Sequence, residues 1–179
     1  MVKNFTRMDD YAEHIRQLFP SLDGFNNQTV RNVTFQVTGA CNLNCSYCYE
    51  HCKECEAMTL DTGKKIVDYL LNQYEKDDGD FITHRTKALV LDFIGGEPLL
   101  EAELIEHICD YYFEQCWKRN IPFAPMSRIS FATNGQLWFT PAAQHLFMKY
   151  HNLMGITVSI DGIQELHDAF RVDVNGVGS

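Results

Sequence analysis

Five of the seven cysteines of this 179-residue chain lie in one short stretch, TGACNLNCSYCYEHCKEC. The first three, Cys41, Cys45 and Cys48, have the spacing C-x3-C-x2-C. Three thiolates can hold three irons of a [4Fe–4S] cubane and leave the fourth iron open for chemistry, as the open position of a catalytic zinc site does. The spacing therefore predicts a metal or cluster centre in this stretch.

Two further cysteines leave the ligand set open. Cys48, Cys52 and Cys55 repeat the same spacing, but Glu54 stands where the first set carries the aromatic Tyr47. We therefore assign the first set as ligands and treat Cys52 and Cys55 as spare thiols. The alternative is that one of them supplies a fourth ligand, which would make the centre a closed electron-transfer cluster or a zinc site without catalysis.

Composition excludes several other classes of protein. Fifteen basic and 24 acidic residues give a net charge of −9, which argues against a nucleic-acid partner. The chain has no apolar run of about 18 residues, so no membrane span is expected. The first residues lack the apolar core of a secretory signal, so we expect a cytoplasmic protein whose clustered cysteines bind metal instead of forming disulfides.

Strand-like and helix-like segments alternate along the chain. Residues 1–30 read as an N-terminal extension with a short helix over 10–19. Thr59 and Thr140 are expected to cap helices, the second with proline at the first helical position. Strands are expected over 31–38, 87–94, 127–133 and 155–160, and helices over 59–74, 99–117, 140–150 and 163–170.

This alternation predicts right-handed parallel crossovers, in either a doubly wound sheet or a (β/α) barrel. Strand 87–94 is almost continuously apolar, as in a sheet buried on both faces. Both architectures place functional loops at the carboxyl ends of the strands. Those loops are the cysteine stretch, GGEP at 95–98, NG at 134–135 and DG at 161–162, where Asp161 is expected to serve as a turn or cap.

Four segments resemble the radical S-adenosylmethionine (radical SAM) superfamily over residues 31–179. CNLNCSYC is similar to its cysteine motif, and GGEP to its glycine-rich loop. ATNG at 132–135 resembles the polar end of the next strand. SIDG…HDAFR at 159–171 is similar to a segment of the SPASM-type peptide and protein maturases, such as sulfatase maturases and ribosomal-peptide maturases.

The resemblance implies a role for each matching residue. Cys41, Cys45 and Cys48 would bind the cluster. The SAM contacts would be Gly95, Gly96 and Glu97 at the methionine amino group, Asn134 near the ribose, Tyr47 near the adenine, and Ser159 with Arg171 at the carboxylate. An acid such as Glu97 can accept from an ammonium, and arginine can bind a carboxylate through two hydrogen bonds. The resemblance names no catalytic acid or base.

The resemblance also implies a fold and a function. The fold would be a partial TIM barrel with about four of the family's six βα units, so that the core domain at 31–179 is incomplete at its C-terminal end. The cofactors would be a [4Fe–4S] cluster and SAM, cleaved to a 5′-deoxyadenosyl radical that modifies a peptide or protein. A flavodoxin or ferredoxin would supply the electron. We expect this chain alone to cleave SAM weakly and without coupling to a substrate.

Overall fold

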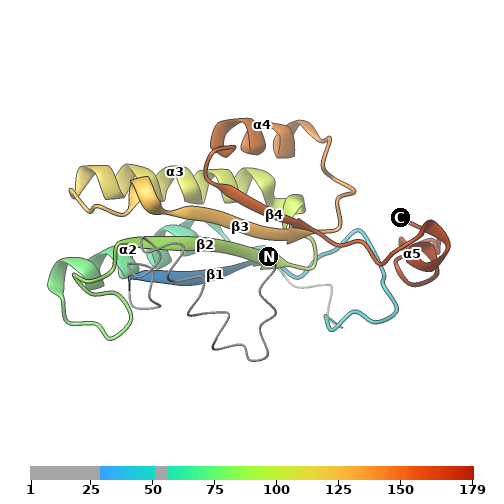
Figure 1. Ribbon diagram of the computed structural model, residues 1–179, viewed down its shortest axis with the longest axis horizontal. Coiled ribbons are helices and arrows are strands. Elements are labelled where there is room, and N and C mark those ends of the chain that lie inside the picture. The colour runs from blue at the N-terminus through green and yellow to red at the C-terminus, as the bar shows by residue number, and fades with distance from the viewer. Residues whose placement is uncertain (1–28, 51–55) are drawn as a thin grey trace, which may run out of the picture.

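The computed structural model describes residues 29–50 and 56–179 (Figure 1). The predicted helix at 10–19, nearly all of the 1–30 extension, Cys52 and Cys55 lie outside the described residues. No helix in the described ranges is long and apolar enough to cross a membrane. The elements are β1 (Val30–Thr38), α2 (Leu60–Lys76), β2 (Ala88–Gly95), α3 (Ala102–Lys118), β3 (Arg128–Thr133), α4 (Pro141–Tyr150), β4 (Met154–Val158) and α5 (Gln164–Phe170), with short 3-10 helices at Pro98–Glu101 and Ala124–Met126.

The four strands form one parallel sheet in the order β1-β2-β3-β4. In register, Phe35 lies beside Phe93, and Phe93 beside Phe131. A doubly wound sheet reverses its strand order at a switch point, whereas a barrel adds each strand beside the one before. The sequential order is therefore that of a barrel arc, and the predicted alternation of strands and helices is confirmed.

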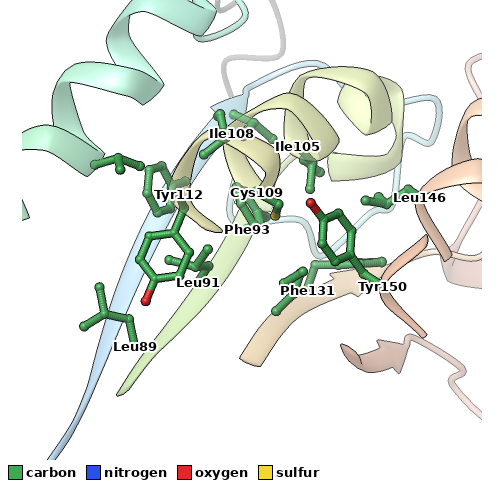
Figure 2. Close-up of a cluster of buried hydrophobic side chains, with 14 of the residues drawn as sticks. Leu89, Leu91, Phe93, Ile105, Ile108, Cys109, Tyr112, Phe131, Leu146 and Tyr150 are labelled. Atoms are coloured by element: carbon green, nitrogen blue, oxygen red, sulfur yellow. The ribbon is translucent and has the colours of Figure 1, made fainter. Parts of the chain in front are cut away.

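The core lies between one face of the sheet and the layer of α2, α3 and α4 (Figure 2). Alternate residues of β2 point into it, since Leu89, Leu91 and Phe93 are fully buried. The other face of β2, with Val90, Asp92 and Ile94, is only half-buried. The prediction that this strand is buried on both faces was therefore wrong, because the face that carries Asp92 is only half-buried.

Helix starts follow from their caps. The Thr59 side chain accepts a hydrogen bond from the Thr62 amide, and the Thr140 side chain accepts one from the Ala143 amide, so both predicted caps are confirmed. The helix predicted from residue 99 instead begins at Ala102, after the 3-10 turn that starts at Pro98. Glu97 precedes that turn and caps it, since its side chain accepts a hydrogen bond from the Leu99 amide.

A charged cluster joins α3 to α4 beside the apolar core. The Lys149 ammonium lies 2.8 Å from a Glu106 oxygen and 2.6 Å from an Asp110 oxygen, and His145 Nδ1 lies 2.7 Å from the other Glu106 oxygen. Burial opposes ionisation of Glu106, but hydrogen bonds from Lys149 and His145 outweigh it and hold the pKa of this carboxyl below its ordinary value. The ionised form of Glu106 therefore stabilises the docking of α4.

We predict that Glu106→Gln lowers the free energy of unfolding at pH 7 by about 1–3 kcal/mol, since it removes a charged acceptor that is 11% exposed. A carboxyl with a lowered folded-state pKa stabilises the fold above its unfolded pKa and loses that effect as the pH falls through the folded value. The gap between wild type and variant should therefore begin to narrow as the pH falls below the unfolded pKa of about 4.3. Urea titrations at pH 7 and pH 3 measure it, with Glu103→Gln, an exposed acid of the same helix, as the control. An equal gap at both pH values would contradict this account.

Candidate functional site

A cavity of about 280 Å³ opens at the carboxyl ends of the strands. It lies where parallel α/β sheets place their binding sites. All ten site residues predicted from the sequence line it: Cys41, Cys45, Tyr47, Cys48, Gly95, Gly96, Glu97, Asn134, Ser159 and Arg171. The structure thus brings together four loops that are distant in the sequence, while the role of each residue toward a ligand stays a prediction.

The cysteine loop carries three half-buried thiols and is hydrogen-bonded to the segment after α5. Leu43, between the first two cysteines, is 2% exposed. Backbone hydrogen bonds join the loop to the segment after α5, from the Asn44 amide to the Val172 carbonyl at 2.6 Å and from the Ser46 amide to the Phe170 carbonyl at 3.0 Å. Figure 1 shows α5 beside this loop, past the end of the sheet.

The three thiols do not form a single-ion site. Within residues 29–50 and 56–179, no three Cys, His, Asp or Glu side chains converge on a point that one metal ion could occupy. A cubane cluster does not require such convergence, because each thiolate binds a different iron. A zinc site completed by Cys52 or Cys55 would involve residues outside the described ranges.

Gly95 and Gly96 lie against the backbone at the start of the cysteine loop. A Cβ at Gly95 would lie 2.5 Å from the Thr38 carbonyl oxygen, and one at Gly96 would lie 2.4 Å from the Ala40 carbonyl oxygen. Hydrogen bonds from the Gly96 amide to Thr38 (3.1 Å) and from the Glu97 amide to Ala40 (2.9 Å) fix this approach. Glycine is therefore required at both positions because the backbone of Thr38 and Ala40 leaves no room for a side chain.

The Glu97 side chain turns inward and joins two strand ends. It is 1% exposed. One oxygen accepts from the Thr133 hydroxyl at 2.7 Å and the Leu99 amide at 3.1 Å, and the other accepts from the Asn134 amide at 2.7 Å. A buried carboxylate requires such partners. The structure thus gives Glu97 a framework role, while its predicted contact with an ammonium group stays a prediction.

Arg171 reaches the cavity from the segment after α5. Its side chain is 10% exposed, and one terminal nitrogen donates to the Tyr47 hydroxyl at 2.7 Å. Tyr47 donates in turn to Asp161, whose second oxygen lies 3.9 Å from the guanidinium. Burial, together with the hydrogen bond to Asp161, raises the pKa of Tyr47, so its hydroxyl stays protonated at neutral pH.

Sequence reasoning missed four residues that line the cavity, Leu43, Tyr49, Ala132 and Thr133, and two residues that hydrogen-bond to lining residues, Asn42 and Asp161. Asp161, expected to be a turn residue, anchors Tyr47. Thr133 donates to Glu97, and Asn42 accepts a hydrogen bond of 2.8 Å from the Asn134 side chain. The only sequence signal for them was their place beside motif residues in loops at the carboxyl ends of strands.

The donor set fits both a cluster and SAM. Three thiols on one cavity are the soft ligands that iron–sulfur clusters use. The Nε of Arg171 is buried and has no hydrogen-bond partner among the described residues. Because a buried N–H without a partner is costly, an anionic ligand group in the cavity would satisfy it. The carboxylate of SAM is such a group.

Comparison with known proteins gives the same assignment. The family described as "4Fe-4S single cluster domain" matches residues 25–164. A radical SAM cyclopropyl synthase, TigE of Paramaledivibacter caminithermalis, is 26% identical over 89% of this chain and 33% of its own length. The chain belongs to the radical SAM superfamily. The family match gives a [4Fe–4S] cluster as its cofactor, as the sequence predicted.

Other similarities describe the fold and the extent of the match. An uncharacterized protein of Methanocaldococcus jannaschii, MJ0907, is 34% identical over 82% of this chain and 44% of that protein. The structure of native anSMEcpe with bound AdoMet and the Cp18Cys peptide superposes with a TM-score of 0.63 at 22% identity, over 84% of this chain and 36% of that one. The radical SAM partial-barrel fold is thereby confirmed. This radical SAM chain spans less than half the length of the curated relatives it matches.

We predict that Gly96→Ala lowers the iron bound per chain at least severalfold after anaerobic reconstitution, because its Cβ would push away the backbone that leads to Cys41. Gly155→Ala is the matched control, since a Cβ there meets nothing within 4 Å. Iron and acid-labile sulfide assays measure the effect. Equal iron in Gly96→Ala and the control would show that the loop tolerates the displacement.

We predict that Tyr47→Phe weakens SAM binding by about threefold to tenfold, the equivalent of about 1 kcal/mol, since Arg171 loses an acceptor that holds it in place. Iron content should not change. SAM titration of the reconstituted protein measures the affinity, and Tyr69→Phe, a tyrosine of α2 that is 63% exposed and does not line the cavity, is the control. Unchanged affinity in Tyr47→Phe would mean that Asp161 alone holds the guanidinium.

Proposed function

We propose that this protein is a radical SAM enzyme that modifies a peptide or protein substrate. The observation that carries the proposal is one cavity lined both by the thiols of Cys41, Cys45 and Cys48 and by Arg171, whose buried Nε–H has no partner among the described residues. A closed electron-transfer site would have no need of an anion-binding group beside its thiols. When bound, the reduced cluster supplies the electron that cleaves SAM to a 5′-deoxyadenosyl radical.

The chain's own residues bind and orient the cofactors. Cys41, Cys45 and Cys48 would hold the cluster, and Arg171 would bind the SAM carboxylate beside Ser159, which also lines the cavity. Tyr47 and Asp161 keep the guanidinium in place. The protein's contribution is thus binding, orientation and exclusion of water, while the cofactor carries the chemistry.

The peptide assignment rests on likeness to other proteins. The segment SIDG…HDAFR is similar to that of peptide and protein maturases, and the superposed structure of anSMEcpe contains a peptide. Fold likeness does not fix a substrate, so the substrate class is proposed from these two similarities. We propose the cytoplasm as the site of action and a flavodoxin or ferredoxin as the reductant.

The alternative is an iron–sulfur or zinc module without catalysis, in which Cys52 or Cys55 adds a fourth thiolate. It predicts that SAM leaves the cluster unchanged, because no iron is open. It also leaves the guanidinium of Arg171 in the cavity unexplained.

The test is electron paramagnetic resonance of the anaerobically reconstituted and reduced protein, with and without SAM. We expect SAM to shift the signal, Cys41→Ala to abolish the cluster, and Cys55→Ala to leave it intact. A signal that ignores SAM, with a cluster lost in Cys55→Ala, would establish the alternative. Formation of 5′-deoxyadenosine with and without a cysteine-containing peptide then tests the substrate class, and acceleration by a nucleotide alone would contradict the peptide assignment.

A further inference from the structure

The side-chain amide of Asn134 faces the first cysteine of the cluster motif. Asn134 follows β3, and its Nδ2 donates to Asn42 Oδ1 at 2.8 Å and lies 4.0 Å from Cys41 Sγ. A carboxamide nitrogen carries two hydrogens, and these two acceptors lie within reach of both. The sequence predicted that Asn134 contacts the SAM ribose, but its two donors are directed at the cysteine loop.

The orientation of this amide is fixed by its other end. Asn134 Oδ1 accepts from the Gln136 amide at 2.9 Å, which closes a turn of the kind that asparagine and aspartate favour. Because Oδ1 is committed to a backbone donor, Nδ2 must face the cysteine loop. The acceptor Oδ1 of Asn42 agrees with that assignment.

Buried hydrogen bonds hold Asn134 from behind. The Glu97 carboxylate accepts from the Asn134 amide at 2.7 Å and from the Thr133 hydroxyl at 2.7 Å. The same hydroxyl oxygen accepts from the Gly135 amide at 3.0 Å. These hydrogen bonds fix the backbone on both sides of Asn134. Rotation of its side-chain amide away from Cys41 would break the hydrogen bonds to Asn42 and to the Gln136 amide.

Cys41 also accepts from the backbone. The Leu43 amide lies 3.4 Å from Cys41 Sγ, so two N–H groups are directed at this sulfur. Hydrogen bonds to the sulfurs of an iron–sulfur cluster set its reduction potential, because they draw charge from the thiolate and favour the reduced state. The Asn134 donor is longer than the backbone donor, so we expect a modest contribution from it.

We propose that Asn134 is a positioning residue that raises the reduction potential of the cluster through Cys41, instead of binding the SAM ribose. This inference rests on the proposed function, because it requires that Cys41 bind the cluster. In this account Asn134 of the ATNG segment affects how readily the cluster is reduced, whereas Tyr47 and Arg171 contribute to SAM binding.

The test is a redox titration of the reconstituted protein without SAM. The electron paramagnetic resonance signal of the reduced cluster measures the extent of reduction at each potential. In Asn134→Leu we expect the ratio of reduced to oxidised cluster at a fixed potential to fall about threefold to tenfold, which is about 30–60 mV for a one-electron couple. Asn134→Asp keeps the turn to Gln136 but replaces the donor with an acceptor, so a larger fall is expected. Asn152→Asp, an exposed residue at the amino end of β4, controls for the added charge.

Each outcome separates the hypotheses. Failure of the wild-type chain to assemble a cluster would overturn the proposed function and this inference with it. Equal iron with an unchanged potential in both Asn134 variants would overturn this inference alone, and weaker SAM binding in the same variants would restore the ribose contact. Loss of iron from Asn134→Asp in a folded apo chain would also overturn it, since retention of the cluster is not the role inferred.

Discussion

The site depends on one buried carboxylate, that of Glu97. Moving a carboxylate out of water is costly unless hydrogen bonds replace its hydration, and here three donors from two strand ends do so. Because these donors belong to the Leu99 turn and to Thr133 and Asn134, the ends of β2 and β3 are fixed relative to each other. The hydrogen bonds that the buried carboxylate requires therefore also fix the geometry at the carboxyl edge of the sheet.

The glycines before Glu97 extend that geometry to the cysteine loop. Gly95 and Gly96 allow the backbone of β1 beyond Thr38 to come closer than any side chain would permit. Hydrogen bonds from the Gly96 and Glu97 amides then hold it there. The GGE sequence thus connects the ends of β1, β2 and β3. Its two glycines allow close backbone contact with the end of β1, and its glutamate accepts hydrogen bonds from the end of β3.

Local patterns made the α/β fold and the location of the site predictable from sequence, whereas the individual residues that line the cavity came from the resemblance to the radical SAM superfamily. The helix caps Thr59 and Thr140 and the alternation of strands with helices are encoded within a few residues, and a parallel sheet brings its carboxyl ends together without further information. The contacts among those loops were not predictable. Tyr47 and Arg171 lie 124 positions apart, and no periodicity links a phenol to a guanidinium over that distance. For the same reason Asp161 was read as a turn residue, since Asp-Gly is common in turns.

Two networks hold the opposite sides of the cavity. Glu97, Thr133 and Asn134 act on the Cys41 side, whereas Asp161, Tyr47 and Arg171 act on the side of the segment after α5. Both networks contact the cysteine loop, one at Asn42 and the other at Tyr47, and the Ser159 amide also donates to the Thr133 carbonyl at 2.9 Å. Energetic effects of residues that share partners are not additive. The fold therefore couples the residues that contact Cys41 to those that hold the guanidinium of Arg171.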